Sequence, residues 1–261
     1  MTILDTIAEA TKCRVDNDRR NLPKAVVRAA AENLPGRDRA FEKALRKKGL
    51  SFICEVKKAS PSKGVIDPAF DHLETAREYA KAGADCISCL TEPEWFLGSD
   101  EIFTDIRSAV ATPMLRKDFT VDSYQIYQAK CLGADAILLI CSLLDPPELA
   151  YYLELCKELG LDALVEARDE KQVEMAADAG ASIIGVNNRN LKDFSVDLTT
   201  TERLRRFAPE DALFVAESGI LTADDITALG KSRPDAVLIG EAFTRAADKA
   251  KLLKEFREAA L

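Results

Sequence analysis

Hydrophobic and polar positions along the chain follow one repeating unit, a short apolar run followed by a longer segment with helical spacing. The runs are rich in β-branched residues, as strands are, and the segments between them place apolar residues on one helical stripe. Eight runs recur, with starts 21 to 35 residues apart: Ser51–Val56, Cys86–Thr91, Met114–Lys117, Ala136–Cys141, Asp162–Ala167, Ile183–Asn188, Leu213–Ser218 and Ala236–Glu241. This alternation predicts a parallel sheet wrapped by helices.

The joint between helix and strand also repeats. It reads Lys81-Ala-Gly-Ala-Asp-Cys-Ile87, Cys131-Leu-Gly-Ala-Asp-Ala-Ile137 and Asp178-Ala-Gly-Ala-Ser-Ile-Ile184. In each copy a glycine stands where a helix ends in a left-handed turn before a short step into a strand.

Eight such units within 261 residues fit one α/β domain, a single (β/α)₈ TIM barrel, which typically needs roughly 250 residues. We assign residues 51–261 to the barrel and residues 1–50 to an N-terminal helical extension packed on it. The extension has helical patterns at Ile3–Asp16 and Arg39–Lys48, joined through Pro23 and Pro35. An open doubly wound sheet is the alternative, but its glycine-rich dinucleotide fingerprint does not follow the first run, where Lys57-Lys58-Ala59-Ser60-Pro61 stands.

Composition narrows the classes of function. A net charge of −8 argues against a nucleic-acid surface, which needs excess Lys and Arg. The first residues resemble no signal peptide, and no apolar run approaches the roughly 20 residues of a membrane span. We therefore expect a cytoplasmic protein without membrane contact.

Cysteine and histidine usage excludes several chemistries. The odd number of seven cysteines fits reduced thiols. Cys86 and Cys89 resemble a redox pair, but in a strand they would point to opposite faces. His72 is the one histidine, so we expect no Ser-His-Asp triad and no multi-histidine metal site, and we place His72 on the surface.

Charged and polar residues end several of the predicted strands, where a barrel should bury both faces. These residues are Glu55, Lys57, Lys117, Glu166, Asn187, Arg189, Glu217 and Ser218. Glu55 and Lys57 lie two positions apart, so they project to the same side of an extended segment. One such charge can be a structural ion pair, but charges at five strand ends together indicate catalysis at the carboxyl-terminal face.

Two loops indicate a phosphate site. Ala216-Glu-Ser-Gly-Ile220 follows the seventh strand and Leu238-Ile-Gly-Glu-Ala-Phe243 the eighth, the places where many barrels present backbone N–H groups to a phosphate. Ser60 could add a hydroxyl, although Ser-Pro-Ser is also a plain turn signal.

At these residues the sequence resembles the indole-3-glycerol-phosphate synthase family over nearly its whole length. The most specific motif is Phe52-Ile-Cys-Glu-Val-Lys-Lys-Ala-Ser-Pro-Ser-Lys-Gly64. Four further motifs occur in family order: Leu90-Thr-Glu-Pro-Glu-Trp-Phe-Leu-Gly-Ser99, Leu115-Arg-Lys-Asp-Phe119, Gly185-Val-Asn-Asn-Arg-Asn-Leu191 and Glu217-Ser-Gly219. The N-terminal helices resemble the family's extension over the active site.

The resemblance implies ring closure, decarboxylation and dehydration of 1-(2-carboxyphenylamino)-1-deoxyribulose 5-phosphate, without metal or organic cofactor. It makes Lys117 the acid that protonates the ketone, Glu166 the stabiliser of the cationic intermediate, and Glu55 with Lys57 the pair for dehydration. We expect the two lysines to depress each other's pKa. The implied catalytic residues are Glu55, Lys57, Lys117, Glu166, Asn187 and Ser218.

The resemblance also assigns the remaining contacts. The benzene ring would enter a slot of Phe96, Phe119 and Leu138. The implied substrate-binding residues are Ser60, Phe96, Phe119, Leu138, Arg189, Glu217, Gly219, Leu238, Gly240 and Glu241. Glu241 stands where a serine is common, which favours a backbone contact with the phosphate, and Trp95 and Phe243-Thr244 also depart from the family's usual loop residues.

Two rival functions remain. A sugar-phosphate isomerase such as phosphoribosyl-anthranilate isomerase needs only one acid and one base, and a catalytically inactive barrel would be expected to have lost a charged strand end. The expected partner is the small phosphorylated anthranilate-sugar substrate. We expect a monomer, in transient contact at most with other tryptophan-pathway enzymes.

Overall fold

The computed structural model describes residues 2–190 and 194–260. Within them eight parallel strands close into a barrel, because β10 pairs with β1 in the register Ser51↔Ala236. In barrel order from β1 the strands are β1 Ser51–Val56, β4 Cys86–Leu90, β5 Met114–Lys117, β6 Ala136–Ile140, β7 Asp162–Ala167, β8 Ile183–Asn187, β9 Leu213–Glu217 and β10 Ala236–Ile239. The predicted (β/α)₈ barrel is confirmed, and the open sheet is excluded.

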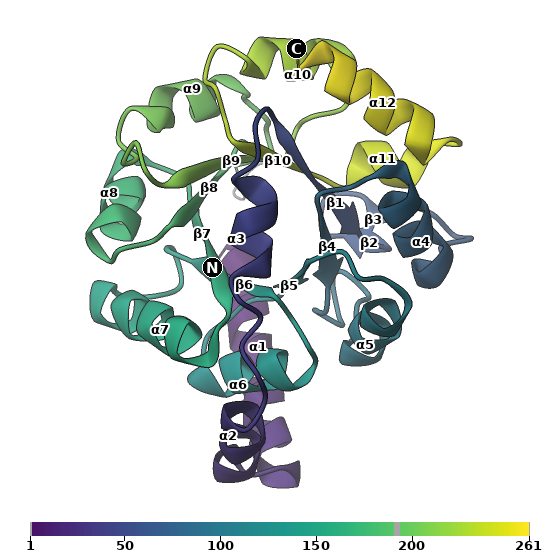
Figure 1. The fold of residues 1–261 in the computed structure, drawn as a ribbon. Coiled ribbons are helices and arrows are strands. Elements are labelled where there is room, and N and C mark those ends of the chain that lie inside the picture. Colours follow the sequence, from purple (N-terminus) through teal and green to yellow (C-terminus); the bar gives the residue numbers. More distant parts are fainter. Residues whose placement is uncertain (1, 191–193, 261) are drawn as a thin grey trace.

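Helices alternate with these strands and form an outer ring (Figure 1). They are α4 His72–Ala82, α5 Asp100–Ala109, α6 Ser123–Cys131, α7 Pro146–Leu159, α8 Glu170–Asp178, α9 Thr199–Arg205, α10 Ala223–Leu229, α11 Glu241–Arg245 and α12 Lys249–Ala259. The loop after β1 holds a small hairpin, β2 Ala59–Ser60 with β3 Gly64–Val65. The repeated joints behave as predicted, since Gly83, Gly133 and Gly180 have φ of 86°, 81° and 82°.

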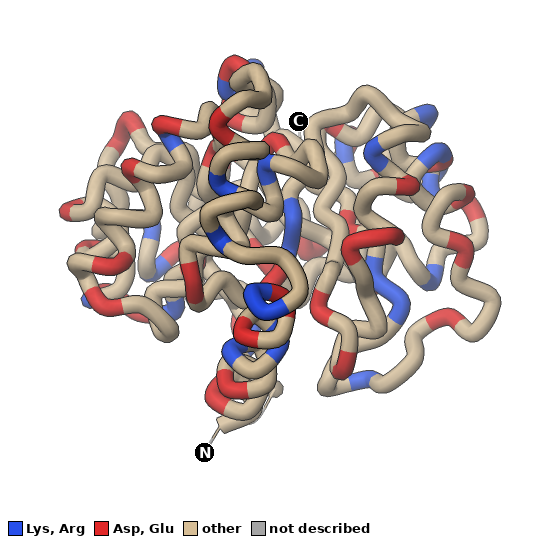
Figure 2. Tube along the Cα trace, turned by 90° about the horizontal axis from the view of Figure 1, so that it is seen from below, with Lys and Arg blue, Asp and Glu red and all other residues tan. Residues whose placement is uncertain are grey.

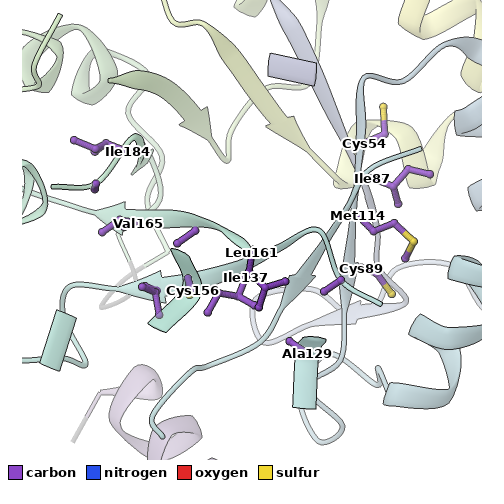
Figure 3. Close-up of a cluster of buried hydrophobic side chains, with 14 of the residues drawn as sticks. Cys54, Ile87, Cys89, Met114, Ala129, Ile137, Cys156, Leu161, Val165 and Ile184 are labelled. Atoms are coloured by element: carbon purple, nitrogen blue, oxygen red, sulfur yellow. The ribbon is translucent and has the colours of Figure 1, made fainter. Parts of the chain in front are cut away.

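Two apolar layers follow from the two faces of each strand. Even-numbered positions of β1, such as Cys54, point outward into a layer under the helices, to which Ile137 and Ile184 contribute from other strands of the barrel (Figure 3). Odd-numbered positions point inward and fill the barrel with residues such as Ile53 and Leu115. Side chains of alternating direction thus supply both layers from one strand.

The cysteines and the histidine occupy the predicted environments. Cys86 belongs to the inner layer and Cys89 to the outer one, so their opposite facing is confirmed. All seven cysteines are free thiols. His72 begins α4 on the surface, with its Nε2 3.1 Å from Asp105 Oδ2.

Three helices precede the barrel, where the sequence pattern predicts two. They are α1 Ile3–Asn21, α2 Lys24–Glu32 and α3 Ala40–Leu45. The sequence pattern missed α2 in the segment that joins the two predicted helices through Pro23 and Pro35. This helix begins directly after Pro23, a residue well tolerated at a helix start. Only Val27 and Ala31 of α2 are buried, so its apolar stripe is too short to stand out.

The extension covers both ends of the barrel (Figure 1). Helix α1 contributes Leu4 and Ile7 to a cavity at the carboxyl-terminal strand ends. Helix α3 lies at the opposite end, where Phe41 joins the inner apolar layer. There the Glu42 backbone N–H donates to the buried Asp162 carboxylate at 2.9 Å.

Acidic and basic residues are interspersed along α1 and around the helix ring (Figure 2). Among the described residues no helix has both the length and the apolar character needed to cross a membrane. Two ion pairs tie α1 to the barrel: Arg14 donates twice to the Asp118 carboxylate, at 2.7 and 2.8 Å, and Arg19 pairs with Asp122 at the start of α6. Asp118 is buried and directly follows β5.

We predict that Arg14→Ala lowers the free energy of unfolding by roughly 2 kcal/mol, because it removes one partner of a largely buried ion pair. Urea denaturation monitored by circular dichroism would measure it. The control is Lys12→Ala on the same helix, whose pair with Glu9 is exposed and should contribute less than about 0.5 kcal/mol. Equal effects of the two substitutions would contradict the anchoring role of Arg14.

Candidate active site

The polar strand ends meet at the barrel axis because strand side chains alternate in direction. Glu55 follows the inward-facing Ile53 by two residues, and Lys117 follows Leu115 in the same way. Glu166 stands in the same relation to Leu164. Each strand therefore carries an apolar side chain inside the barrel and a polar one above it, at the carboxyl-terminal mouth.

Lys117 stands at the centre of this polar layer. Its Nζ lies 3.3 Å from Glu217 Oε2, 3.8 Å from Glu166 Oε2 and 4.0 Å from Glu55 Oε2. Four different strands, β5, β9, β7 and β1, supply the four charges. The lysine is a cation that the barrel holds among three carboxylates.

Glu55 is paired a second time. Lys57 Nζ donates to its Oε1 at 2.6 Å, and the Ser88 hydroxyl donates to its Oε2 at 3.4 Å. Burial by itself would raise the pKa of the Glu55 carboxyl, but the ammonium groups of Lys57 and Lys117 outweigh burial and hold that pKa below its usual value. Glu55 is therefore a carboxylate at neutral pH.

The expectation of a depressed lysine pKa is wrong for Lys117. Burial favours the neutral amine, but the carboxylates of Glu217, Glu55 and Glu166 act more strongly together and raise the pKa of Lys117 well above its usual value. The expectation considered the second lysine and overlooked that three acids surround the first. At neutral pH Lys117 is present in its acid form.

Glu217 is buried tightly against the neighbouring strand. Gly185 on the neighbouring strand β8 makes room for it, because a Cβ there would overlap the Glu217 carboxylate. The carboxylate has no hydrogen-bond partner with good geometry, although Lys117 is close. Burial raises the pKa of Glu217 to about 7, against the opposing effect of Lys117.

Asn187 and Arg189 extend the site along the end of β8. The Asn187 side-chain amide donates to Glu166 Oε1 at 3.2 Å, which orients that carboxylate. The Arg189 backbone N–H donates to Asn187 Oδ1 at 2.9 Å, and its guanidinium donates to the Phe194 carbonyl. Leu191, the last residue of the motif predicted here, lies outside the described residues.

The two loops predicted to bind phosphate lie on the same side of the mouth. Ser218 and Gly219 both adopt left-handed backbone conformations, with φ of 66° and 83°; this conformation is strained for serine. Gly240 lies against the Glu55–Lys57 pair, since a Cβ there would come within 2.6 Å of Glu55 Oε1. The carboxylate of Glu241 turns to Lys63 Nζ at 3.7 Å and Arg245 Nε at 3.2 Å.

The predicted apolar slot is a wall of the same cavity. The rings of Phe96 and Phe119 lie 6.0 Å apart between centroids, and Leu138 and Leu238 project from β6 and β10 below them. Phe96 comes from the loop after β4 and Phe119 from the loop after β5. The aromatic wall of the cavity therefore comes from two loops, whereas the charged side chains of the cluster come from strands.

All sixteen sequence-predicted site residues line one cavity, whatever role each has. Sequence reasoning missed other lining residues: Ile3, Leu4, Ile7, Pro61, Ser62, Ile66, Leu90, Asp118, Ile140, Phe194, Ile220, Leu221 and Ile239. The apolar spacing of the first three indicates a buried helix face but not the surface it contacts. Within residues 2–190 and 194–260, no group of three His, Cys, Asp or Glu side chains is arranged to hold a metal ion.

Comparison with known protein families identifies the chain. The family model described as indole-3-glycerol phosphate synthase matches residues 4–256. The chain belongs to the indole-3-glycerol phosphate synthase family. The matched residues include all eight strands of the barrel, most of the N-terminal extension and every residue of the charged cluster.

Individual relatives agree with the family assignment. The indole-3-glycerol phosphate synthase of Ruminiclostridium cellulolyticum is 51% identical over 99% of this chain and 100% of its own length. That of Endomicrobium trichonymphae is 49% identical over 98% of this chain and 100% of its own. Agreement over both full lengths means that the extension and the barrel are shared together.

Solved structures support the fold alone. A 3-hexulose-6-phosphate synthase superposes with a TM-score of 0.63 at 17% identity, covering 81% of this chain and 100% of its own. The thiamine phosphate pyrophosphorylase from Pyrococcus furiosus gives 0.62 at 18% identity, over 83% of this chain and 97% of its own. The barrel of this indole-3-glycerol phosphate synthase family member is thus an architecture shared at low sequence identity.

The raised pKa of Glu217 predicts a pH-dependent stability. Its native carboxyl titrates at about 7 rather than 4.5, so the stabilisation present below pH 4.5 is lost as the pH rises through 7. Between these limits the wild type should lose on the order of 2 kcal/mol relative to Glu217→Gln. Urea denaturation at a series of pH values would measure the difference.

A matched control is Glu210→Gln, which changes an exposed carboxylate. Its unfolding free energy should follow that of the wild type at every pH. Parallel curves for wild type and Glu217→Gln would show that the Glu217 carboxyl titrates normally and would contradict its burial as an acid.

Proposed function

We propose that the chain converts 1-(2-carboxyphenylamino)-1-deoxyribulose 5-phosphate into indole-3-glycerol phosphate, carbon dioxide and water. The observation that carries the proposal is the cluster of Lys117 with three glutamates beside an aromatic wall. Family membership supports the same reaction. An isomerase on this fold would need one acid and one base, which leaves most of this cluster without a task.

Lys117 is the general acid of ring closure in this proposal. Its ammonium donates a proton to the ketone oxygen while the anthranilate ring attacks the ketone carbon, so that the carbon–carbon bond and a hydroxyl form together. The surrounding carboxylates keep the lysine protonated at neutral pH. Glu217, which titrates near neutrality, lies close enough to return a proton to it.

Glu166 stabilises the cationic intermediate that precedes decarboxylation. Its carboxylate lies on the Lys117 side of the cavity and is oriented by Asn187. A fixed negative charge in a site with little water lowers the energy of a developing cation without reorganisation. Loss of carbon dioxide then returns the bonding electrons to the ring.

Glu55 and Lys57 carry out the dehydration. Lys57 gives a proton to the departing hydroxyl, and Glu55 accepts the proton that leaves the substrate, so that water is released and the indole ring becomes aromatic. The contact of 2.6 Å between Lys57 Nζ and Glu55 Oε1 supports this division. At that distance the proton that Glu55 accepts can pass back to Lys57, which restores both residues after the step.

The anionic groups of the substrate define its orientation. We assign Arg189 to the substrate carboxylate, and Ser60, Ser218, Gly219 and Gly240 to the phosphate. Because Glu241 is engaged by Lys63 and Arg245, backbone N–H groups rather than this side chain contact the phosphate. The benzene ring then lies against the apolar wall that Phe96, Phe119 and Leu138 form.

We propose in addition that the protein acts in the cytoplasm, as expected for a biosynthetic enzyme of this family. The monomeric state stays a prediction from the sequence, to be measured by light scattering after gel filtration.

We predict that Lys117→Met abolishes indole formation while substrate binding is largely retained, because methionine preserves the apolar stem and removes the proton donor. The appearance of indole fluorescence measures turnover, and calorimetric titration measures binding. The control is Lys58→Met. This lysine follows Lys57 in the chain but does not line the cavity, so its loss should leave turnover near the wild-type rate. Normal turnover by Lys117→Met would remove the assigned acid.

We predict that Glu166→Gln lowers kcat by two orders of magnitude or more, about 3 kcal/mol of transition-state stabilisation, because it removes the negative charge and keeps the shape. Steady-state kinetics with the same substrate gives the rate. A loss below about threefold, roughly 0.7 kcal/mol, would be too small for the proposed role.

A further inference from the structure

The loop between β4 and α5 contains a buried carboxylate that the proposed chemistry does not use. Glu92 is 2% exposed, two residues beyond the end of β4. Unlike the catalytic glutamates, it does not line the cavity. A buried charge of this kind is costly unless hydrogen bonds compensate it.

The compensation comes from the loop's own backbone. Glu92 Oε1 accepts from the N–H of Glu94 at 2.9 Å, and Oε2 accepts from those of Trp95 at 2.8 Å and Phe96 at 3.0 Å. Three successive N–H groups thus converge on one carboxylate. A fourth bond, from the Gly98 N–H to the Glu92 carbonyl, closes the loop.

The rest of the loop cannot relax to replace these bonds. Leu97 has a φ of 53°, a left-handed conformation that costs a non-glycine residue energy. Gly98 touches the backbone of Leu90, so that a Cβ there would overlap the Leu90 carbonyl. The loop is therefore folded tightly onto the end of β4, and the Glu92 carboxylate is the acceptor that holds its first turn.

This folding of the loop determines where the ring of Phe96 lies. Phe96, whose N–H binds Glu92, lines the cavity with its ring 6.0 Å from that of Phe119. Without the carboxylate, the N–H groups of residues 94–96 would need other acceptors, and the chain would turn away from the cavity to reach water.

We propose that Glu92 is a positioning residue that folds the β4–α5 loop so that Phe96 forms one wall of the substrate's aromatic slot. Through Phe96 it sets the affinity for a substrate that carries a benzene ring, and it leaves the proton transfers to the strand residues. The effect on affinity rests on the proposed function, but the effect on the loop does not.

The chain's single tryptophan lies in this loop, so fluorescence of Trp95 reads the loop without any substrate. Glu92→Ala should shift the emission to longer wavelength and raise acrylamide quenching about twofold or more, as expected for a ring that gains access to water. Glu92→Gln should change both less, because one amide oxygen can still accept from Trp95 and Phe96. The matched control, Glu94→Ala, removes an exposed carboxylate from the same loop and should leave the spectrum unchanged.

Kinetics then tests the link to Phe96. Glu92→Ala should raise KM by about tenfold with kcat changed less than about threefold, as for lost ground-state binding. Phe96→Ala should raise KM at least as much, and the double variant should be no worse than Phe96→Ala alone, because coupled residues are not additive. Glu92→Gln, which keeps the fold even where alanine does not, should raise KM to an intermediate value.

An unchanged Trp95 spectrum in both Glu92 variants, or additive effects of Glu92→Ala and Phe96→Ala on KM, would overturn the proposal. Failure of the proposed function would look different, because the wild type itself would then form no indole. In that case the tryptophan measurements would still decide whether Glu92 holds the loop.

Discussion

The structure depends on a charge balance at the barrel axis. One ammonium, that of Lys117, is buried among the carboxylates of Glu55, Glu166 and Glu217, and a second, Lys57, neutralises part of the excess negative charge. Buried charges of one sign would be expelled or neutralised. Held together by four strands, they form a layer in which proton donors and acceptors are in place before any substrate arrives.

The geometry of the barrel allows these charges to be buried together. Alternation along each strand places apolar side chains inside the barrel below and polar ones above, so the charges need no separate scaffold. Neighbouring strands also fit together in size, because Gly185 has no side chain and the Glu217 carboxylate occupies the space that a Cβ would take. Loops add what strands cannot, an aromatic wall whose position depends on hydrogen bonds such as those of Glu92. The strands thus carry the residues for proton transfer, and the loops carry those that bind the aromatic ring.

The sequence predicted the parts that local patterns determine. Strand bounds agree within two residues, as at β10, which ends at Ile239 rather than Glu241, because short apolar runs and glycine joints are local signals. Helix α2 was missed because its apolar stripe is short, and the pKa of Lys117 was predicted in the wrong direction because its acid neighbours lie on other strands. The contact of Leu4 with the cavity depends on how the extension packs, which no local pattern encodes.

The central claim is that three carboxylates keep Lys117 protonated inside the barrel. Lysine-specific isotope labelling, with the signal assigned by its absence in Lys117→Met, allows an NMR titration of this ammonium. The account predicts that it keeps its proton beyond the ordinary lysine pKa of 10.5, to the highest pH at which the fold survives. Loss of the proton below that value would show that burial outweighs the carboxylates and would contradict the account.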